Sequence, residues 1–495
     1  MKIKQFHEYS ELDDPVVVQP TAFGGEQKLT HLYLAQLATE RYKSKLRWNT
    51  DERGWHCFDN ESGMWQRIGT EQIIALLIVT LSEMRSIEAE KIKISGSTRG
   101  SVIKEIERAE NSGFLNGAES ILRSMPELEI DAAAFDADPY LVGLENGQVL
   151  DLRTSSVRAI NQTDYLTKRI NTPYIAGAKS QLWEKSIRTW ACDDEELGKF
   201  LQVWCGYCLS GLTNFQGFLF LHGGGRNGKS VFVNVISRLL GPYAIAMKSD
   251  TLIEKPVSNG PSGDIARLKG VRFATCNELP EGKHFNEELL KSLTGQDTLT
   301  ARFSYQDDFN FKPNLKLMIC GNHQPVIKGV DNGVWRRVNI VPFVASIPEE
   351  AADPDLTDDL INELAGILNW CIEGWKTLQQ QGMKIQIPSK VKAATAHYKS
   401  DMDILGDWLE EKTEQIIGSK SHLKEMYRSY GNWCQENGFR SVPTSKSFNR
   451  KLKERGLGEP LRDAVGFYYP DIEVRYGTSY EYVINPPLNH RFDKD

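Results

Sequence analysis

Apolar residues recur every three or four positions in some parts of the chain and form alternating or unbroken short runs in others. The first pattern predicts helices and the second predicts strands. Turn residues between 58 and 64, and Asn146-Gly147, predict two hairpins. Helices are expected over residues 31–42, through much of 70–125, and over 180–215 and 231–240. Strands are expected at 46–49, 54–58, 64–68, 146–154, 218–221, 268–278, 315–321 and 338–343.

The apolar run at 218–221 leads into a glycine-rich turn that carries candidate chemistry. From Gly223 to Ser230 the spacing fits Gly-x-x-x-x-Gly-Lys-Ser, and a helix follows. Small residues let successive backbone N–H groups face an anion, which a helix N-terminus also favours. Lys229 is expected to reach the β- and γ-phosphates of a nucleotide, and the Ser230 hydroxyl to ligate Mg²⁺. The phosphate-binding residues would be Gly223, Gly224, Gly225, Arg226, Asn227, Gly228, Lys229 and Ser230. A glycine-rich turn without a ligand is the alternative.

Polar residues at the ends of later strands extend this prediction. Glu278 ends one buried run, where a carboxylate is placed to hold Mg²⁺ or to polarise the attacking water. A helix cap is the alternative for Glu278. Asn322 ends the next run and is expected to hydrogen-bond the γ-phosphate or the attacking water. Arg336 and Arg337 precede the strand at 338–343, and a guanidinium group there suits a phosphoryl group bound by a neighbouring subunit. The alternative is a surface pair at a strand edge.

Composition narrows the class of protein. The chain has 495 residues, 40% of them hydrophobic, which is enough for about three domains with real cores. An apolar run long enough to span a membrane is missing, so no membrane partner and a cytoplasmic location are expected. Eight scattered cysteines indicate reduced thiols, and Cys205 and Cys208 lie within a helical run, which argues against redox chemistry. A net charge of −7 leaves room for DNA binding confined to a channel or one domain.

Two further segments carry weaker signals. Asp136 and Asp138 have the spacing of a metal-binding carboxylate pair, but Pro139 follows directly and favours a turn. Residues 256–263 combine proline, serine, asparagine and glycine and are expected to be mobile.

In order and spacing, the motifs resemble the superfamily three helicases, specifically the helicase portion of phage, plasmid and poxvirus primase-helicases. The resemblance rests on Gly223 to Ser230, Asn277 to Gly282, Leu290 to Asp297 with Ala301 to Phe303, Gly321 to Pro325 and Asp331 to Arg337. Residues 136–154 and 164–168 are similar to the region that these proteins carry before their ATPase core. Residues 427–434 and 445–457 are similar to their C-terminal winged-helix-like module.

This resemblance implies an α/β P-loop NTPase core of the AAA+-like type. The implied domains are a flexible arm at 1–30, a mixed and mainly helical N-terminal domain at 31–200, the ATPase domain at 201–385 and a small winged-helix-like domain at 386–495. The N-terminal domain would serve as an oligomerisation collar. A primase catalytic domain is not recognisable, so primer synthesis is not implied.

The implied activity is that of a replicative DNA helicase of a mobile element. Homo-hexameric rings would hydrolyse ATP with Mg²⁺ between subunits and move 3′ to 5′ along single-stranded DNA at a fork, beside a separate primase or polymerase. Lys229, Ser230, Glu278 and Asn322 would act on the nucleotide, and Arg336 would be the trans finger with Arg337 beside it. An ATP-switched replication initiator without processive unwinding is the alternative. A packaging or transport ATPase would leave the later motifs unexplained.

DNA-contacting residues are expected in two regions. The family places a channel hairpin at residues 303–312, where the tip is acidic in this chain. Lysines and arginines outnumber glutamates between 420 and 455, and the helical pattern of 445–456 is able to present them to a duplex, a solvated face being the alternative. Lys291 matches a further basic position of the family pattern. The candidate DNA-binding residues are Arg302, Lys312, Lys316, Lys446, Arg450 and Lys451, with Lys453 on the same helix.

Overall fold

A computed structural model describes most of the chain, and residue contacts divide it into two compact units. The first unit comprises the described residues before position 326 and those from 337 to 392; the second comprises those from 326 to 336 and from 393 onward. The described residues are 28–95, 100–254, 263–279, 283–303, 307–322, 327, 332–402, 404–437 and 442–475. Nearly all of the expected arm, the segment 256–263 except its last residue, and Asp331 lie outside them.

A five-stranded parallel sheet forms the centre of the first unit. Its strand order is β14-β8-β13-β10-β9, and every neighbouring pair runs parallel. The strands are β8 (Phe218–His222), β9 (Ala244–Met247), β10 (Phe273–Asn277), β13 (Lys316–Gly321) and β14 (Val338–Pro342). The side chains of β8, β10, β13 and β14 are almost all buried, as expected for a parallel sheet covered by helices on its faces. Those of the edge strand β9 are only partly buried. The mixed α/β class predicted from the sequence is therefore present.

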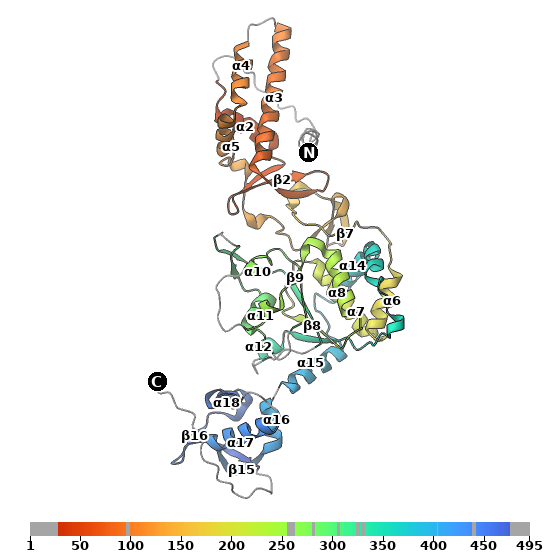
Figure 1. The fold of residues 1–495 in the computed structure, drawn as a ribbon, viewed down its shortest axis with the longest axis vertical. Coiled ribbons are helices and arrows are strands. Elements are labelled where there is room, and N and C mark those ends of the chain that lie inside the picture. Colours follow the sequence, from red (N-terminus) through yellow and green to blue (C-terminus); the bar gives the residue numbers. More distant parts are fainter. Residues whose placement is uncertain are drawn as a thin grey trace. The chain divides into compact units, whose positions relative to one another are not determined.

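Helices cover this sheet (Figure 1). The core joins apolar side chains of the sheet to those of α6, α7, α8 and α14. The helices of the first unit that follow the N-terminal region are α6 (Gln181–Trp190), α7 (Glu195–Leu209), α8 (Lys229–Leu240), α9 (Ser249–Leu252), α10 (Gly263–Ala266), α11 (Glu287–Thr294), α13 (Leu356–Asn362) and α14 (Leu364–Gln380). The helices expected over 180–215 and 231–240 are confirmed.

The strand expected at 268–278 begins later than predicted, at Phe273. Residues before it form a turn in which Gly270 has φ +70°, a conformation that suits glycine and interrupts an extended strand. Leu268 and Val271 are still buried. The apolar run therefore predicted which residues are buried, but it placed the start of the strand too early.

Helices α7 and α14 pack closely because glycines face each other's backbone. A Cβ atom on Gly206 would lie 2.2 Å from the backbone nitrogen of Trp375, and one on Gly374 would lie 2.0 Å from the carbonyl oxygen of Gln202. Cys205 and Cys208 lie in α7 and are buried. Burial raises the pKa of the Cys208 thiol to about 12 and holds that of Cys205 well above its usual range, which disfavours thiolate chemistry.

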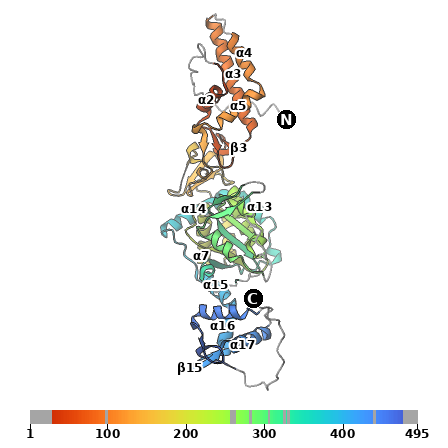
Figure 2. The ribbon, with the colours of Figure 1, turned by 90° about the vertical axis from the view of Figure 1, so that its left-hand side faces the viewer.

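The N-terminal region combines helices with two small sheets. Helices α3 and α4 run side by side (Figures 1 and 2). The helices are α2 (His31–Tyr42), α3 (Thr70–Ser95), α4 (Gly100–Ala109) and α5 (Ser112–Leu122). The strands are β1 (Leu46–Asn49), β2 (Gly54–Asp59), β3 (Met64–Ile68), β4 (Glu129–Ile130), β5 (Leu141–Leu144), β6 (Gln148–Asp151) and β7 (Ser156–Ala159). Both predicted hairpins are confirmed, as β2–β3 and as β5–β6 with Asn146 and Gly147 at positive φ.

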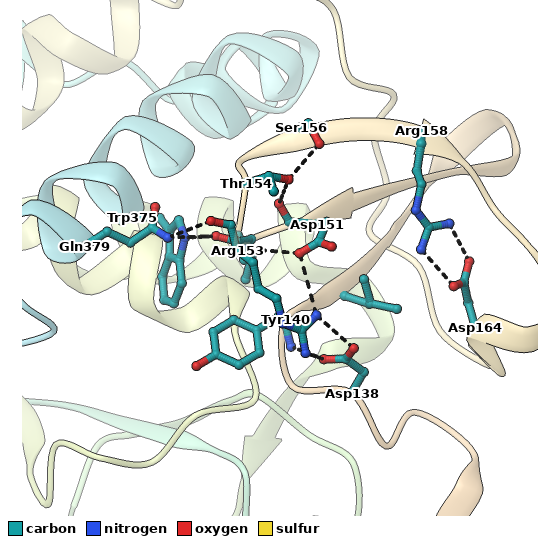
Figure 3. A network of polar contacts seen from close by, with 12 residues as sticks. Asp138, Tyr140, Asp151, Arg153, Thr154, Ser156, Arg158, Asp164, Trp375 and Gln379 are labelled. Atoms are coloured by element: carbon teal, nitrogen blue, oxygen red, sulfur yellow. Dashed lines mark hydrogen bonds and ion pairs between the residues drawn. The ribbon is translucent and has the colours of Figure 1, made fainter.

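A polar network fixes the turn between β6 and β7 against α14 (Figure 3). The Trp375 indole N–H and the Gln379 amide both donate to the Leu152 carbonyl, at 2.6 and 3.1 Å. The Arg153 guanidinium forms a two-pronged ion pair with Asp138 at 2.8 and 2.9 Å. Asp136 accepts from the Thr167 N–H at 2.9 Å. Both aspartates therefore have structural partners, and the turn interpretation of this pair is supported over a metal site.

In the described residues of the second unit, helices α16, α17 and α18 accompany a three-stranded antiparallel sheet with the order β15-β17-β16. Its core is built around Trp408, Tyr430, Phe448 and Tyr469. The elements are α12 (Asn332–Trp335), α16 (Ile404–Lys412), β15 (Thr413–His422), α17 (Leu423–Glu436), α18 (Ser445–Leu452), β16 (Leu461–Arg462) and β17 (Phe467–Val474). Helix α15 (Ser389–Asp401) begins in the first unit and continues into the second.

Lys316 is buried at the start of β13, so the prediction that it contacts DNA does not fit its position. Its ammonium group donates to the carbonyl oxygens of Ser210, Leu212 and Asn314 and lies 4.9 Å from the centre of the Tyr207 ring. Lys316 is part of the apolar run at 315–321 that predicted the strand, and it is buried together with that strand. Burial lowers the pKa of the Lys316 ammonium to about 7.

We expect the free energy of unfolding to rise with pH above 7 because of Lys316. Between pH 7 and the ordinary lysine value the unfolded chain binds this proton and the folded chain does not, which adds up to about 1.4 kcal/mol per pH unit. Denaturant unfolding at pH 7 and 9 measures the slope. The Lys316→Met protein should lose this part of the slope, and an unchanged slope would contradict the assignment.

Within the described residues, no helix is both long enough and apolar enough to cross a membrane.

Candidate functional site

The glycine-rich loop lies between strand β8 and helix α8, as the sequence predicted. Two of its glycines are enclosed by other parts of the chain. A Cβ atom on Gly223 would lie 2.0 Å from the carbonyl oxygen of Phe343, and one on Gly228 would lie 2.0 Å from the indole nitrogen of Trp190. Gly228 also has φ +84°. The loop therefore requires glycine at both positions, for space at each and for conformation at Gly228.

Asn227 connects the loop to the neighbouring strand. Its buried side-chain amide donates to the carbonyl oxygens of Gly224 at 2.6 Å and Phe343 at 2.8 Å. Its oxygen accepts from the Lys229 ammonium at 2.9 Å. Asn227 thus holds the shape of the loop and positions the lysine.

Lys229 opens α8 and points back over the loop. Its ammonium donates to the carbonyl oxygens of Gly223 and Gly224, at 2.8 and 2.9 Å, and to the Asn322 amide oxygen at 3.2 Å. These partners and Asn227 are all neutral. Burial lowers the pKa of Lys229, with the nearby Cys320 thiol acting in the opposite sense. A buried cation with only neutral partners is well suited to receive an anion.

Glu278 and Asn322 follow strands that lie next to each other at the same sheet edge. β13 is flanked by β8 and β10, so the loop, Asn322 and Glu278 follow three consecutive strands at their carboxyl ends. Glu278 has φ +56°, uncommon for a glutamate, and its N–H donates to the Cys320 carbonyl at 3.0 Å. The side chains of both residues are exposed. Ligand sites in open parallel sheets occur at such an edge.

The remaining nucleotide-site candidates differ in exposure. Ser230 and Arg226 are exposed, and Arg226 forms an ion pair with Glu349 at 2.9 Å. Arg336 is exposed whereas Arg337 is buried. Arg336 falls in the second unit and Arg337 in the first.

The candidate DNA residues near the predicted channel hairpin lie around a short β-ribbon. Strands β11 (Leu299–Ala301) and β12 (Phe309–Phe311) pair antiparallel, so the first strand precedes the predicted segment 303–312. The Phe303 ring stacks on Phe309 with centroids 5.5 Å apart, although Phe303 lies beyond the end of β11. Arg302 lies 3.6 Å from Asp308, and Lys312 is exposed. The tip residues 304–306 lie outside the described part.

In the second unit, the basic residues of α18 lie opposite its buried face. Phe448 and Leu452 are buried, whereas Lys446 and Arg450 are exposed and Lys451 is half-buried. The pattern that predicted a helix presenting basic residues is thus confirmed at the level of structure. DNA contact by these residues stays a prediction.

Sequence patterns missed two residues that shape the glycine-rich loop. Trp190 lies at the end of α6, far upstream, and packs on Gly228. Phe343 follows β14 and contributes its backbone carbonyl to Asn227. Neither contact leaves a local signal, because one depends on tertiary packing and the other on a main-chain atom. The only hint is that large aromatic residues such as Trp190 are commonly buried.

Comparisons with known proteins agree with the motif order. Residues 35–193 match the family described as D5 N terminal like, and residues 221–337 match a family of unknown function, DUF5906. The putative helicase L207/L206 of Acanthamoeba polyphaga mimivirus is 24% identical over 86% of this chain and 48% of its own length. The putative primase C962R of African swine fever virus is 24% identical over 66% of this chain and 36% of its own length.

The chain spans less than half of each of these two relatives. Among solved structures, the apo C-terminal region of NrS-1 aligns with 90% of this chain and 100% of its own, at 11% identity and a TM-score of 0.47. The matched N-terminal segment and the viral relatives confirm the resemblance, drawn from the motifs, to the phage and viral primase-helicase family.

Proposed function

We propose that this chain is an ATP-dependent DNA helicase of a replication system, with an AAA+-like P-loop core. The single observation that carries the proposal is the buried Lys229, held by neutral oxygen atoms beside a loop that requires glycine. The viral relatives are named putative helicases and primases, which supports unwinding as the use of the nucleotide.

Each residue of the site has a role that follows from its position. Lys229 would exchange its carbonyl partners for the β- and γ-phosphates of ATP, and Asn227 would keep the loop in shape during that exchange. Asn322 already touches the Lys229 ammonium, so it is placed to sense whether a γ-phosphate is present. Glu278 would orient and polarise the attacking water from the same sheet edge.

The chemistry that a bound Mg²⁺ would supply is positive charge to stabilise the phosphoryl group during transfer. The Ser230 hydroxyl and the Glu278 carboxylate are the groups proposed to hold it. Among the described residues, no cluster of three or more His, Cys, Asp or Glu is arranged as a metal site. This fits Mg²⁺, which commonly binds to one or two protein groups together with substrate phosphates and water.

Assembly and polarity complete the proposal. We infer a homo-hexameric ring, with Arg336 reaching the ATP of a neighbouring subunit because it is the exposed member of the arginine pair. The ring would move 3′ to 5′ on single-stranded DNA at a fork beside a separate primase or polymerase. The three helices and antiparallel sheet of the second unit support a winged-helix-like module whose α18 would bind DNA through Lys446, Arg450 and Lys451.

An unwinding assay with tailed duplexes tests this function. We expect ATP hydrolysis to be faster with single-stranded DNA and strand separation to require ATP and a 3′ tail, with ring-shaped particles visible by electron microscopy. Duplexes with only a 5′ tail are the matched control for polarity. Binding to duplex DNA with little strand separation on either tail would contradict a helicase and favour an ATP-switched initiator.

A further inference from the structure

A β-hairpin in the second unit exposes apolar side chains that the fold does not use. Strands β16 and β17 pair Leu461 with Tyr468 and Arg462 with Phe467, and a four-residue turn joins them. Leu461 is 52% exposed, Phe467 is 50% exposed, and Val465 in the turn is 79% exposed. Single exposed apolar residues are ordinary, but three within one short hairpin mark a contact surface.

The turn of this 461–468 hairpin is held in one shape by Asp463. Its carboxylate accepts from the N–H groups of Val465 at 2.9 Å and Gly466 at 3.1 Å. It also pairs with Lys420 at 2.7 Å and His422 at 3.1 Å, both on β15. These partners, Lys420 first, hold the pKa of Asp463 well below its usual range. The tip is thus preorganised, and the charge of its aspartate is balanced.

The 461–468 hairpin is joined to the basic helix α18. The Tyr469 hydroxyl, on the strand that follows the turn, donates to the Asn449 side-chain oxygen of α18 at 2.8 Å. Lys446 and Arg450 are exposed on α18, opposite the buried Phe448. A partner that meets both elements would therefore meet cations and an apolar tip together.

Duplex DNA fits this combination better than a protein partner does. Protein interfaces are depleted in lysine at their cores, whereas DNA-binding surfaces use lysine and arginine on phosphates. Proteins that deform DNA insert apolar side chains between base pairs, with arginine close by. On the hairpin, the Arg462 guanidinium lies 5.5 Å from the centre of the Phe467 ring.

We propose that the 461–468 hairpin is a wedge that inserts Val465 and Phe467 between neighbouring base pairs of duplex DNA while α18 holds the backbone. The inference rests on the proposed function only in taking DNA as the substrate. Unstacking one base step costs a few kcal/mol, and apolar contact with the exposed bases offsets that cost. The hairpin would thereby weaken the duplex without consuming ATP.

The test uses the full chain, without ATP, and a duplex that carries 2-aminopurine, whose fluorescence rises when it loses stacking. We expect the wild-type protein to bind the duplex and raise the fluorescence. The double variant Val465→Ser/Phe467→Ala should lose the rise and bind about tenfold more weakly. Both side chains are largely exposed, and the Val465 N–H bond to Asp463 survives the change, so folding is preserved. The matched control is Ile417→Ser, at a 94% exposed position on β15, which should behave as wild type.

Unchanged fluorescence and affinity in the double variant would overturn the wedge. So would a double variant that loses self-association by sedimentation while keeping the fluorescence rise, because the hairpin would then contact a second copy of the chain. Strand-stimulated ATP hydrolysis is measured on the same samples. Stimulated hydrolysis without a fluorescence rise would contradict the wedge proposal and leave the helicase proposal standing. A fluorescence rise without stimulated hydrolysis would contradict the helicase proposal and leave the wedge proposal standing.

Discussion

We expect the Lys229→Met protein to lose ATP hydrolysis by roughly 10²–10³-fold or more while staying folded. The phosphates lose their cation, and a single preorganised charge at a transferring group contributes on this scale. Stability should be unchanged or higher, because the methionine fills the space of the lysine stem and removes a buried charge whose partners are all neutral. Phosphate release and denaturant unfolding, measured on the same protein, separate the two effects.

The matched control is Lys199→Met, which removes an exposed lysine from α7. It should hydrolyse ATP at the wild-type rate. Equal losses in the two proteins would mean that net charge, not the position of Lys229, governs the reaction.

The Lys229→Met variant, mixed with an Arg336→Ala variant, also tests whether ATP is hydrolysed between subunits. An Arg336→Ala subunit keeps its loop and lacks the finger, whereas a Lys229→Met subunit keeps the finger and lacks the lysine. In an equal mixture that assembles at random, about a quarter of the interfaces would combine an intact loop with an intact finger. We expect hydrolysis to recover toward that fraction, and no recovery at any mixing ratio would count against Arg336 acting in trans.

The second large effect is expected at the contact between α7 and α14. The Gly206→Ala protein should unfold more easily, by about 3 kcal/mol, because the added methyl group would lie 2.2 Å from a backbone nitrogen that has no rotamer to change. Thermal and denaturant unfolding of the first unit measure the loss. Both backbones have to separate to admit the group, so neighbouring core side chains lose contact as well.

Gly198→Ala is the matched control for this effect, since it lies in the same helix. A Cβ atom there would be 3.5 Å from Ile187, an ordinary contact. Replacing a helical glycine by alanine without a clash raises stability by about 0.5–1 kcal/mol. Equal destabilisation by the two changes would show that helix propensity, not the close approach of α14, sets the cost.

Local patterns predicted most of what depends on neighbours in the sequence. The α2 bounds, the two N-terminal hairpins and the strand–loop–helix around Lys229 were predicted because period, turn residues and glycine spacing act over a few positions. The burial of Lys316 was not predicted, because the apolar run around it has the pattern of a strand whether the lysine faces water or carbonyl groups.

Features that depend on distant partners were missed. Strands β15 and β17 alternate poorly, with exposed Ile416 and Ile417 where the pairing is interrupted, so period alone does not reveal them. The ribbon that includes β11 starts before the predicted segment, since its first strand pairs over residues 299–301 and ends ahead of Phe303. The nucleotide roles of Glu278 and Asn322 stay predictions, although the sheet places them at one edge.

The position of Trp190 beneath Gly228 determines where a recombinant fragment that contains the glycine-rich loop can begin. A recombinant fragment that starts at the expected boundary, residue 201, would omit this indole and the first turns of α7. The loop would then contact solvent where the intact chain places the Trp190 indole. Its glycine backbone would gain conformational freedom that this contact restricts in the intact chain. A fragment meant to keep the glycine-rich loop in its native shape therefore has to begin upstream of α6.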